Sequence, residues 1–295
     1  MSERKAEGAL VLAAFFFGVT FVLVQDAIED VTPAGYITIR FIIGAVVLAP
    51  FAWRISRRNR EPPGLLWRAG TVAGLLLFAG YITQTIGLQY IESSTSAFIT
   101  GLYAIFTPVI EAIVRRRLPP MGVCLGIVIA TGGLFLLTGA ELTFGRGELL
   151  TLACAVSFAI WIVYQGGYAN RLHTIPFVTV QMAVLAGASV PVTATTGFGE
   201  LTGVALFAAA FTGVACSSVA LSLQLYGQRR ISPSRAALIL LTEPVFAGIV
   251  GYLAGERLGA VRLTGAAIIL VGIAIAEAGP GRAEDERATA GATDG

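Results

Sequence analysis

Residues 84–109 read QTIGLQYIESSTSAFITGLYAIFTPV, and residues 224–245 read QLYGQRRISPSRAALILLTEPV. The two stretches carry the same four residue types at the same spacing, with one constant offset in numbering: Gln84, Gly87, Ile91 and Ser94 against Gln224, Gly227, Ile231 and Ser234. A second pair, ITIR at 37–40 and VTVQ at 178–181, is followed ten residues later by a proline in both cases. Because self-similarity at a fixed distance marks a repeated structural unit, the chain is predicted to consist of two related halves.

The composition predicts a membrane protein that crosses the bilayer several times. Of the 295 residues, 56% are hydrophobic and only 13% are charged, which leaves too little polar surface for a soluble protein of this size. The net charge of +2 and the scattered basic residues predict no nucleic-acid partner. The three cysteines lie in apolar runs without disulfide or metal spacing, and are interpreted as small buried hydrophobic residues: Cys124, Cys154 and Cys216.

The apolar runs predict an all-α polytopic protein with about ten transmembrane helices. A membrane-spanning helix needs roughly 20 mostly apolar residues. Such runs lie near 8–25, 34–53, 70–88, 96–114, 120–138, 148–168, 175–195, 202–226, 236–254 and 260–278. They divide into two five-helix repeats, 8–138 and 148–278. Residues 1–7 are the predicted N-terminal segment, 139–147 a linker, and 279–295 a disordered tail.

The distribution of arginine and lysine predicts the orientation, because both are enriched in cytoplasmic loops. If the N-terminus is cytoplasmic, 16 basic residues fall inside, 3 fall outside, and Arg40 falls within a span. Both termini are therefore predicted to be cytoplasmic and the linker extracytoplasmic. Five helices per half is an odd number, so the second repeat is predicted to be inverted relative to the first.

Glu243 is the most costly residue to place in a membrane, since it falls near the middle of the ninth predicted span. One interpretation is a protonatable group that faces a cavity, or a partner for a cationic substrate. The other is structural: Pro244 removes a backbone donor and frees a carbonyl upstream, and a protonated Glu243 would help to satisfy the broken helix. Both interpretations remain open at this stage.

Two other charged residues lie within predicted spans. Glu111 stands four residues before Arg115, the spacing of an ion pair within one helix, and this structural interpretation is favoured. Arg40 has no charged counterpart in the second half, where Gln181 stands. For Arg40, anchoring of the helix or of a gate and contact with a substrate are equally weighted, with Asp26 or Glu29 as candidate partners.

Polar and aromatic side chains in other spans are candidates for lining a central cavity. Gln84 and Gln224 occupy matching positions, where each amide faces either the cavity or a hydrogen-bond partner on another helix. The aromatic candidates are suited to amphipathic organic solutes, although each alone fits simple packing or an interfacial belt. The candidate substrate-binding residues are Phe17, Tyr81, Gln84, Tyr103, Trp161, Tyr164, Gln224 and Glu243.

Prolines and glycines predict where helices bend and where they pack closely. Pro244 follows Ser234 about one helical turn sooner than Pro108 follows the matching Ser94, so the two helices are predicted to kink at different depths. Glycines four residues apart predict faces where helices approach closely: Gly70/Gly74, Gly122/Gly126 and Gly251/Gly255.

The motifs of several enzyme classes are missing from the sequence. It contains no phosphate-binding Gly-Lys-Ser/Thr loop, no cluster of residues with metal-ligand spacing, and no nucleophile beside a candidate base. We therefore predict neither an enzyme nor a protein with a cofactor or bound metal.

The second half carries a longer motif, Thr242-Glu243-Pro244-Val245-Phe246 followed by Gly255-Glu256-Arg257-Leu258 and by Gly265 and Gly272. With the duplication and ten spans, it resembles the EamA branch of the drug/metabolite transporter superfamily over about residues 8–278. The first half is looser, because Arg115-Arg116-Arg117 stands where the family pattern ends in Gly-Glu-Arg.

The resemblance implies a central cavity lined by spans 1, 3, 4, 6, 8 and 9 that opens alternately to the two sides of the cytoplasmic membrane. It implies export of small organic metabolites or drugs, with proton antiport through Glu243 as a secondary hypothesis. The alternative is a non-transporting membrane scaffold or ligand-binding protein built on the same bundle. The expected partners are a small-molecule substrate and the lipid bilayer, and a monomer and a homodimer both remain open.

Overall fold

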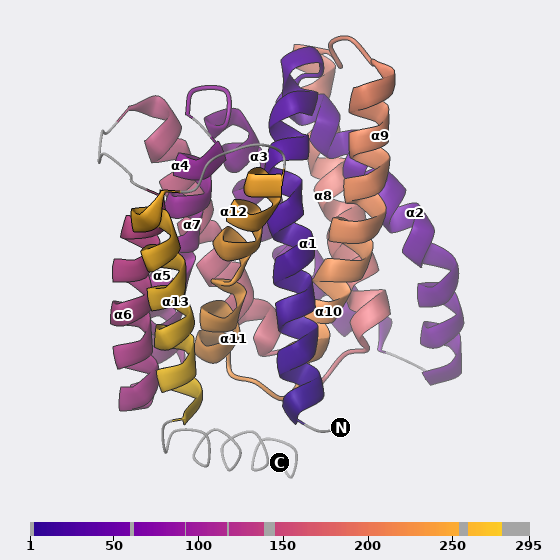
Figure 1. The fold of residues 1–295 in the computed structure, drawn as a ribbon. Helices are drawn as coiled ribbons and strands as arrows, with labels where there is room; N and C mark the ends of the chain where they lie inside the picture. The colour runs from indigo at the N-terminus through magenta and orange to yellow at the C-terminus, as the bar shows by residue number, and fades with distance from the viewer. Residues whose placement is uncertain are drawn as a thin grey trace.

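The computed structural model describes residues 3–59, 62–91, 93–116, 118–138, 145–253 and 259–278. Over these residues the protein is a bundle of helices without a strand (Figure 1), and only the isolated bridge between Val31 and Gly199 has strand-like pairing. Parts of the predicted N-terminal segment and linker lie outside the described residues, as do the whole predicted tail and the Gly-Glu-Arg-Leu stretch from Gly255 to Leu258.

The helices follow the two predicted halves. The first half contains α1 (Glu3–Asp30), α2 (Pro33–Asn59), α3 (Pro63–Gly87), α4 (Ser93–Gly101), α5 (Tyr103–Arg115) and α6 (Met121–Thr138). The second contains α7 (Arg146–Gly166), α8 (Thr174–Thr196), α9 (Gly203–Phe211), the π-helix η1 (Thr212–Ala220), α10 (Leu221–Gly227), α11 (Pro233–Leu240), α12 (Glu243–Leu253) and α13 (Ala260–Ala278). Proline at the first position of α2, α3 and α11 fits the first helical turn, where its missing N–H costs no hydrogen bond.

The described helices confirm an all-α membrane protein. Seven helical stretches of the described residues are long and apolar enough to cross a bilayer. Two shorter apolar stretches, Met121–Leu136 and Leu263–Ile275, lie in α6 and α13. The fourth of the ten predicted spans is divided between α4 and α5, so neither of its helices reaches the length of a spanning helix by itself.

Two helices break at matching positions of the two halves. The first break is at Leu102, between α4 and α5, and the second is at Leu241 and Thr242, between α11 and α12. Both contain tight backbone bonds, with Leu102 N–H donating to Ile99 at 3.2 Å and Thr242 N–H donating to Ile239 at 3.1 Å. The breaks keep the offset of the duplication, whereas the prolines do not.

The prolines therefore do not set the depths of the two breaks. Pro244 is the second residue of α12, directly after its break, whereas Pro108 lies within α5, six residues after Leu102. The difference in depth expected from the spacing of the prolines is not seen in the breaks themselves.

Helices at corresponding positions in the two halves pack against each other in antiparallel pairs. In α6 and α13, a Cβ on Gly133 would meet Gly265 O and Ile269 N at 2.7 Å, and one on Gly272 would meet Gly126 O at 2.6 Å and Ala130 N at 2.8 Å. Gly133, late in α6, meets residues early in α13, whereas Gly272, late in α13, meets residues early in α6. The two helices are therefore antiparallel. The same holds for α2 and α8, where Thr38 bonds Ser189 and Thr193, and Gly44 lies against Met182.

A predicted small-residue face lies where α3 crosses α8. A Cβ on Gly70 would come within 2.4 Å of Val180, and one on Gly74 would come within 2.7 Å of Gln181 O. Without hydrophobic attraction between helices in lipid, close approach at such residues supplies the van der Waals contact that holds the helices together.

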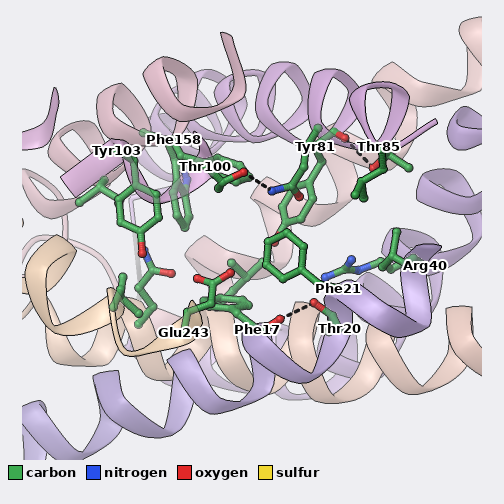
Figure 2. Close-up of a pocket in the computed structure, with 18 residues that line it drawn as sticks. Phe17, Thr20, Phe21, Arg40, Tyr81, Thr85, Thr100, Tyr103, Phe158 and Glu243 are labelled. Carbon is green, nitrogen blue, oxygen red and sulfur yellow. Dashed lines mark hydrogen bonds between the residues drawn. The ribbon is translucent and has the colours of Figure 1, made fainter. Parts of the chain in front are cut away.

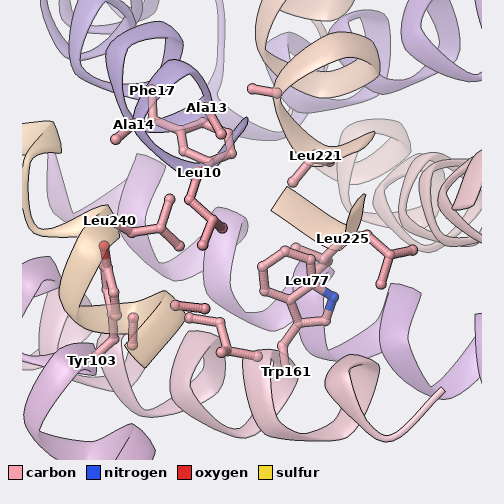
Figure 3. Close-up of a cluster of buried hydrophobic side chains, with 14 of the residues drawn as sticks. Leu10, Ala13, Ala14, Phe17, Leu77, Tyr103, Trp161, Leu221, Leu225 and Leu240 are labelled. Atoms are coloured by element: carbon pink, nitrogen blue, oxygen red, sulfur yellow. The ribbon is translucent and has the colours of Figure 1, made fainter. Parts of the chain in front are cut away.

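The largest buried cluster joins both halves at the centre of the bundle (Figure 3). It brings together side chains of α1, α3, α5, α7, α10 and α11, among them Leu10, Leu77, Tyr103, Trp161, Leu225 and Leu240. Because the helices that contribute come from both halves, this core holds the halves as one unit around the helix breaks.

The α6–α13 pair offers a matched test of this packing. Gly133→Ala places a methyl group against the backbone of α13, and overpacking of this kind costs about 1–3 kcal/mol. Gly132→Ala meets nothing within 4 Å, and replacing a helical glycine by alanine gains about 0.5–1 kcal/mol. Thermal unfolding in detergent should move down for the first variant and slightly up for the second. Equal shifts would contradict the close contact.

Candidate substrate cavity

A cavity lies between the two helix breaks (Figure 2). Its volume is about 50 Å³, and it is lined by 18 side chains from α1, α2, α3, α4, α5, α7, α10, α11 and α12, together with Leu88 at the end of α3. Glu243 lies ten residues after Pro233, where α11 begins. At about 1.5 Å per residue, this places the carboxylate near the middle of a hydrocarbon layer about 30 Å thick.

Most residues that line the cavity form pairs related by the duplication. Seven pairs stand at the offset of the repeat or one position beyond it: Phe17/Phe158, Thr20/Trp161, Phe21/Ile162, Tyr81/Leu221, Gln84/Gln224, Thr100/Leu240 and Tyr103/Glu243. The last two pairs flank the two helix breaks. Four further lining residues come from the first half alone: Val24, Arg40, Thr85 and Leu88.

Glu243 begins α12 and faces the cavity, where its side chain is partly exposed. Gly18 of α1 lets the two backbones approach closely, because a Cβ there would lie 2.6 Å from Glu243 O. Among the described residues, no side chain or backbone group donates a hydrogen bond to the carboxylate, and no cation forms an ion pair with it. The carboxylate is thus held by its backbone and directed into the cavity, rather than used to satisfy the broken helix.

Arg40 lies in the same cavity and is 4% exposed. Its Nε donates to Ser217 Oγ of η1 at 3.0 Å, and its guanidinium lies 5.0 Å from the centre of the Tyr81 ring. The predicted carboxylate partners, Asp26 and Glu29, form no ion pair with it. Instead, a hydroxyl and an aromatic face stabilise the cation, and no carboxylate within the described residues neutralises it.

The two matched glutamines differ in their hydrogen bonding. Gln84 donates from Nε2 to Thr100 Oγ1 at 3.0 Å, which closes the cavity wall beside the first break. Gln224 is 2% exposed and its buried Nε2 has no hydrogen-bond partner in the structure. A buried donor without an acceptor costs about 1–3 kcal/mol, so Gln224 presents an unused donor where a ligand oxygen is able to accept it.

Aromatic rings form the apolar wall of the cavity. Tyr81 contacts Phe41 and Phe158 edge to face, with ring centres 4.9 and 5.1 Å apart. Trp161 donates from Nε1 to Gln181 Oε1 at 2.8 Å, so the residue that replaces Arg40 in the second half orients an aromatic ring.

Tyr164 is the one candidate that lies away from this cavity. It is three residues beyond Trp161 on α7 and contacts Tyr168, with ring centres 5.2 Å apart, beside a separate hollow formed with the start of α3. The other seven candidate residues, Phe17, Tyr81, Gln84, Tyr103, Trp161, Gln224 and Glu243, all line the central cavity.

Some of the residues that the sequence prediction missed follow from the same repeat. Tyr81 was a candidate, and Leu221 stands 140 residues after it; Phe17 was a candidate, and Phe158 stands 141 residues after it. Thr100 and Leu240 carry no chemical signal of their own, but they stand beside the two breaks. The pair Phe21/Ile162 and the four unpaired residues from the first half had no such signal, apart from the charge of Arg40.

A cluster of buried and partly buried polar side chains lies at one end of the bundle. It is here called the latch: Glu3, Glu7, Glu111, Ser234 and Arg235. Arg235 Nη1 lies 2.7 Å from Glu3 Oε1, and its Nη2 lies 3.5 Å from Glu7 Oε1, with the arginine side chain 1% exposed. Ser234 donates from its backbone N to Glu111 Oε2 at 2.9 Å and also from its hydroxyl. The latch joins α1 and α5 of the first half to α11 of the second.

Glu111 also makes the ion pair predicted from its spacing. Arg115 Nε lies 3.0 Å from Glu111 Oε1. The other carboxylate oxygen caps the start of α11, where backbone N–H groups lack partners within the helix. The ion pair was predictable from the local sequence, whereas the cap on a helix of the other half was not.

The geometry is that of a polytopic membrane protein with a central polar site between broken helices, the arrangement of secondary transporters. The sequence matches the EamA-like transporter family over residues 4–139 and again over 145–277, so the chain belongs to this family.

Known proteins similar to this chain carry transporter names. An "uncharacterized transporter" of Archaeoglobus fulgidus is 30% identical over 92% of this chain and 85% of its own length. The "uncharacterized inner membrane transporter YedA" of Escherichia coli is 25% identical over 92% of this chain and 90% of its own. A solved crystal structure has a TM-score of 0.76 at 20% identity, with 93% of this chain and 97% of that chain covered, which establishes likeness of fold alone.

The two glutamines give opposite expectations for stability. Gln224→Leu removes a buried donor that has no partner, so the free energy of unfolding should stay the same or rise by about 1–3 kcal/mol. Gln84→Leu removes the donor to Thr100 and should lower it by about 1 kcal/mol. Unfolding of the purified protein in detergent measures both. A loss of stability in Gln224→Leu as large as that in Gln84→Leu would mean that the Gln224 amide has a structural partner.

Proposed function

We propose that the protein is a secondary-active transporter that exports small organic solutes across the cytoplasmic membrane by alternating access. The observation that carries this proposal is the cavity framed by both helix breaks, with Thr100 and Tyr103 on either side of one and Leu240 and Glu243 on either side of the other. Irregular backbone at membrane depth is tolerated where it lines a cavity or is buried in protein. A scaffold that only holds a partner needs neither the breaks nor the cavity.

We infer that the two halves form inverted repeats of five spans each. Support comes from the antiparallel packing of corresponding helices. It also comes from their reciprocal contacts, in which each residue of one helix meets the counterparts of the residues that its own counterpart meets. Gly133 meets Gly265 and Ile269, while the corresponding Gly272 meets Gly126 and Ala130, which themselves correspond to Gly265 and Ile269. Such reciprocal contacts are expected around a two-fold axis in the membrane plane.

The cavity is shifted toward one end of the bundle, which supports a state closed at the other. Its four unpaired lining residues include Val24, near the end of α1, and Leu88, just after the end of α3. Both α1 and α3 begin on the side of the bundle that is predicted to be cytoplasmic, so these two residues lie toward the other side. The latch lies at the start of α1, the side that the arginine distribution predicts to be cytoplasmic. We therefore interpret this conformation as closed to the cytoplasm.

The volume of the cavity fits an occluded or contracted state. About 50 Å³ is room for a few water molecules, whereas sites for small organic ligands usually measure about 300–1,000 Å³. Transport then requires the halves to move apart around the cavity, and the latch is the contact that must open for solute to enter from the cytoplasm.

Proton antiport through Glu243 is tested by removing its charge. Glu243→Gln keeps the shape of the side chain, so uptake by proteoliposomes in response to a pH gradient should be abolished, with the protein still folded. Glu200→Gln, at an exposed position, is the matched control and should transport like the unaltered protein. The assay uses a mixed pool of amino acids, nucleobases and organic cations, with and without the gradient.

Three results are informative in that assay. Solute movement that depends on the gradient in the unaltered protein and not in Glu243→Gln supports coupling. An unchanged pH dependence in Glu243→Gln would rule out the coupling role and leave a facilitator. The absence of movement for every solute in an extended pool would favour the scaffold.

The role of the latch is tested through the accessibility of Ala6, which is fully buried against Gly227 beside the latch. In a background with the native cysteines replaced by alanine, Ala6→Cys should react slowly with a membrane-impermeant maleimide. Adding Arg235→Gln removes the cation that contacts Glu3 and Glu7. Breaking a buried ion pair costs about 3–5 kcal/mol, so labelling should accelerate more than about tenfold. The neighbouring Arg230→Gln, at an exposed position, is the control, and equal rates in the two variants would contradict the latch.

A further inference from the structure

The central cavity holds one arginine and one glutamate that form no ion pair with each other. Arg40 and Glu243 both line it, yet no ion pair joins them and neither has an oppositely charged partner among the described residues. Figure 2 shows the two side chains toward opposite ends of the cavity, with Phe21 between them. Arg40 belongs to α2, seven residues after its first residue Pro33, whereas Glu243 is the first residue of α12.

Two uncompensated charges at this depth are costly to keep. Charged side chains within a membrane normally pair with one another or with backbone groups, and a buried charge without a partner is penalised by several kcal/mol. A cavity of about 50 Å³ admits too few waters to solvate both groups fully. Arg40 contacts Ser217, Phe41 and Tyr81. Neither Arg40 nor Glu243 has an oppositely charged partner among the described residues, so their arrangement points to a ligand that supplies both missing charges.

We propose that the transported solute is an amphipathic zwitterion whose ammonium and carboxylate groups lie at opposite ends of an apolar segment. In this arrangement, which rests on the proposed transport function, Arg40 binds the carboxylate and Glu243 binds the ammonium group. Because the two protein charges lie at opposite ends of the cavity, a solute that satisfies both carries its own charges at its two ends.

The hydrogen bonding of Arg40 fits this role. Its Nε is already occupied by Ser217 and its plane is held against Tyr81. The two terminal nitrogens have no partner among the described residues, and they form the fork that binds a carboxylate through two parallel hydrogen bonds. Lysine offers only a point charge, so the planar group matters for the orientation of the solute.

The wall between the two charges suits an apolar segment. Phe17 and Phe21 of α1 and Tyr81 of α3 line this part of the cavity. A solute with a cation alone would leave Arg40 unpaired beside it, and one with an anion alone would leave Glu243 unpaired. Each single-charged solute thus meets one repulsive group, which is how a site discriminates between partners of similar size.

The proposal is tested with matched probes that differ only in charge or in charge separation. The zwitterions are 4-aminobutyrate, 6-aminohexanoate and 8-aminooctanoate. Hexylamine and hexanoate each carry one of the two charges, and leucine carries both on one carbon. Binding to the purified full-length protein in detergent is measured by titration calorimetry, which avoids the passive permeation of neutral forms through lipid. At least one of the three end-to-end zwitterions should bind more than about tenfold tighter than hexylamine, hexanoate and leucine, as expected when two charge-assisted hydrogen-bonded contacts replace one.

Charge-removing variants then assign each end of the solute. Arg40→Gln should lose affinity for the zwitterion by about 10- to 100-fold and bind hexylamine better than hexanoate. Glu243→Gln should show the reverse preference. This ratio is measured within each folded variant and so does not depend on its stability. Arg54→Gln, exposed on the same helix as Arg40, and Glu200→Gln are the controls and should bind like the unaltered protein.

The outcomes separate this proposal from the transport function on which it rests. Tighter binding of leucine, hexylamine or hexanoate than of every end-to-end zwitterion would overturn it, as would identical charge preferences in the two variants. If proteoliposomes move other solutes from the mixed pool but none of the zwitterions, transport stands and the proposed substrate class is wrong. If no solute moves and none binds, both the function and the substrate class are refuted.

Discussion

The structure depends on one constraint, which is that every backbone N–H and C=O within a bilayer needs a partner inside the protein. Continuous helices meet it by themselves, but the breaks at Leu102 and at Leu241–Thr242 do not. Tight backbone bonds at each break, from Leu102 N–H to Ile99 and from Thr242 N–H to Ile239, satisfy part of this need. The cavity lies between these breaks, and its polar groups are available to a ligand there.

Corresponding positions of the two halves carry different side chains in the cavity. Tyr103 corresponds to Glu243, and Arg40 corresponds to Gln181, so each half contributes one charge at a position where the other half has a neutral group. Gln181 turns away to accept from Trp161, and Gln84 is bonded while Gln224 is not. Duplication supplied the frame, and departures from symmetry at a few side chains give the cavity a direction.

The sequence predicted the helical class and the duplication, and seven of its eight candidate residues line the cavity. These features could be predicted because apolar runs, polar residues within them and repeated motifs can all be recognised in the sequence itself. It missed the position of Tyr164, since one further turn along α7 carries the ring out of the cavity. The depths of the breaks could not be inferred from Pro108 and Pro244, because the breaks follow the duplication rather than the prolines. The latch also escaped prediction, since Glu3 and Arg235 meet only when α1 and α11 pack side by side.

The positions of the two charges connect ligand binding to motion of the halves. Arg40 belongs to α2 in the first half and Glu243 to α12 in the second, so one solute bound to both ties the halves together. A ligand shifts a conformational equilibrium only by its difference in affinity between states. A bridging solute binds most tightly to the conformation in which the distance between Arg40 and Glu243 matches the distance between its own two charges. Without a solute, the two side chains stay unpaired. The latch already joins the halves near the start of α1. In the proposed transport cycle, a bridging solute and the latch would therefore both resist separation of the halves.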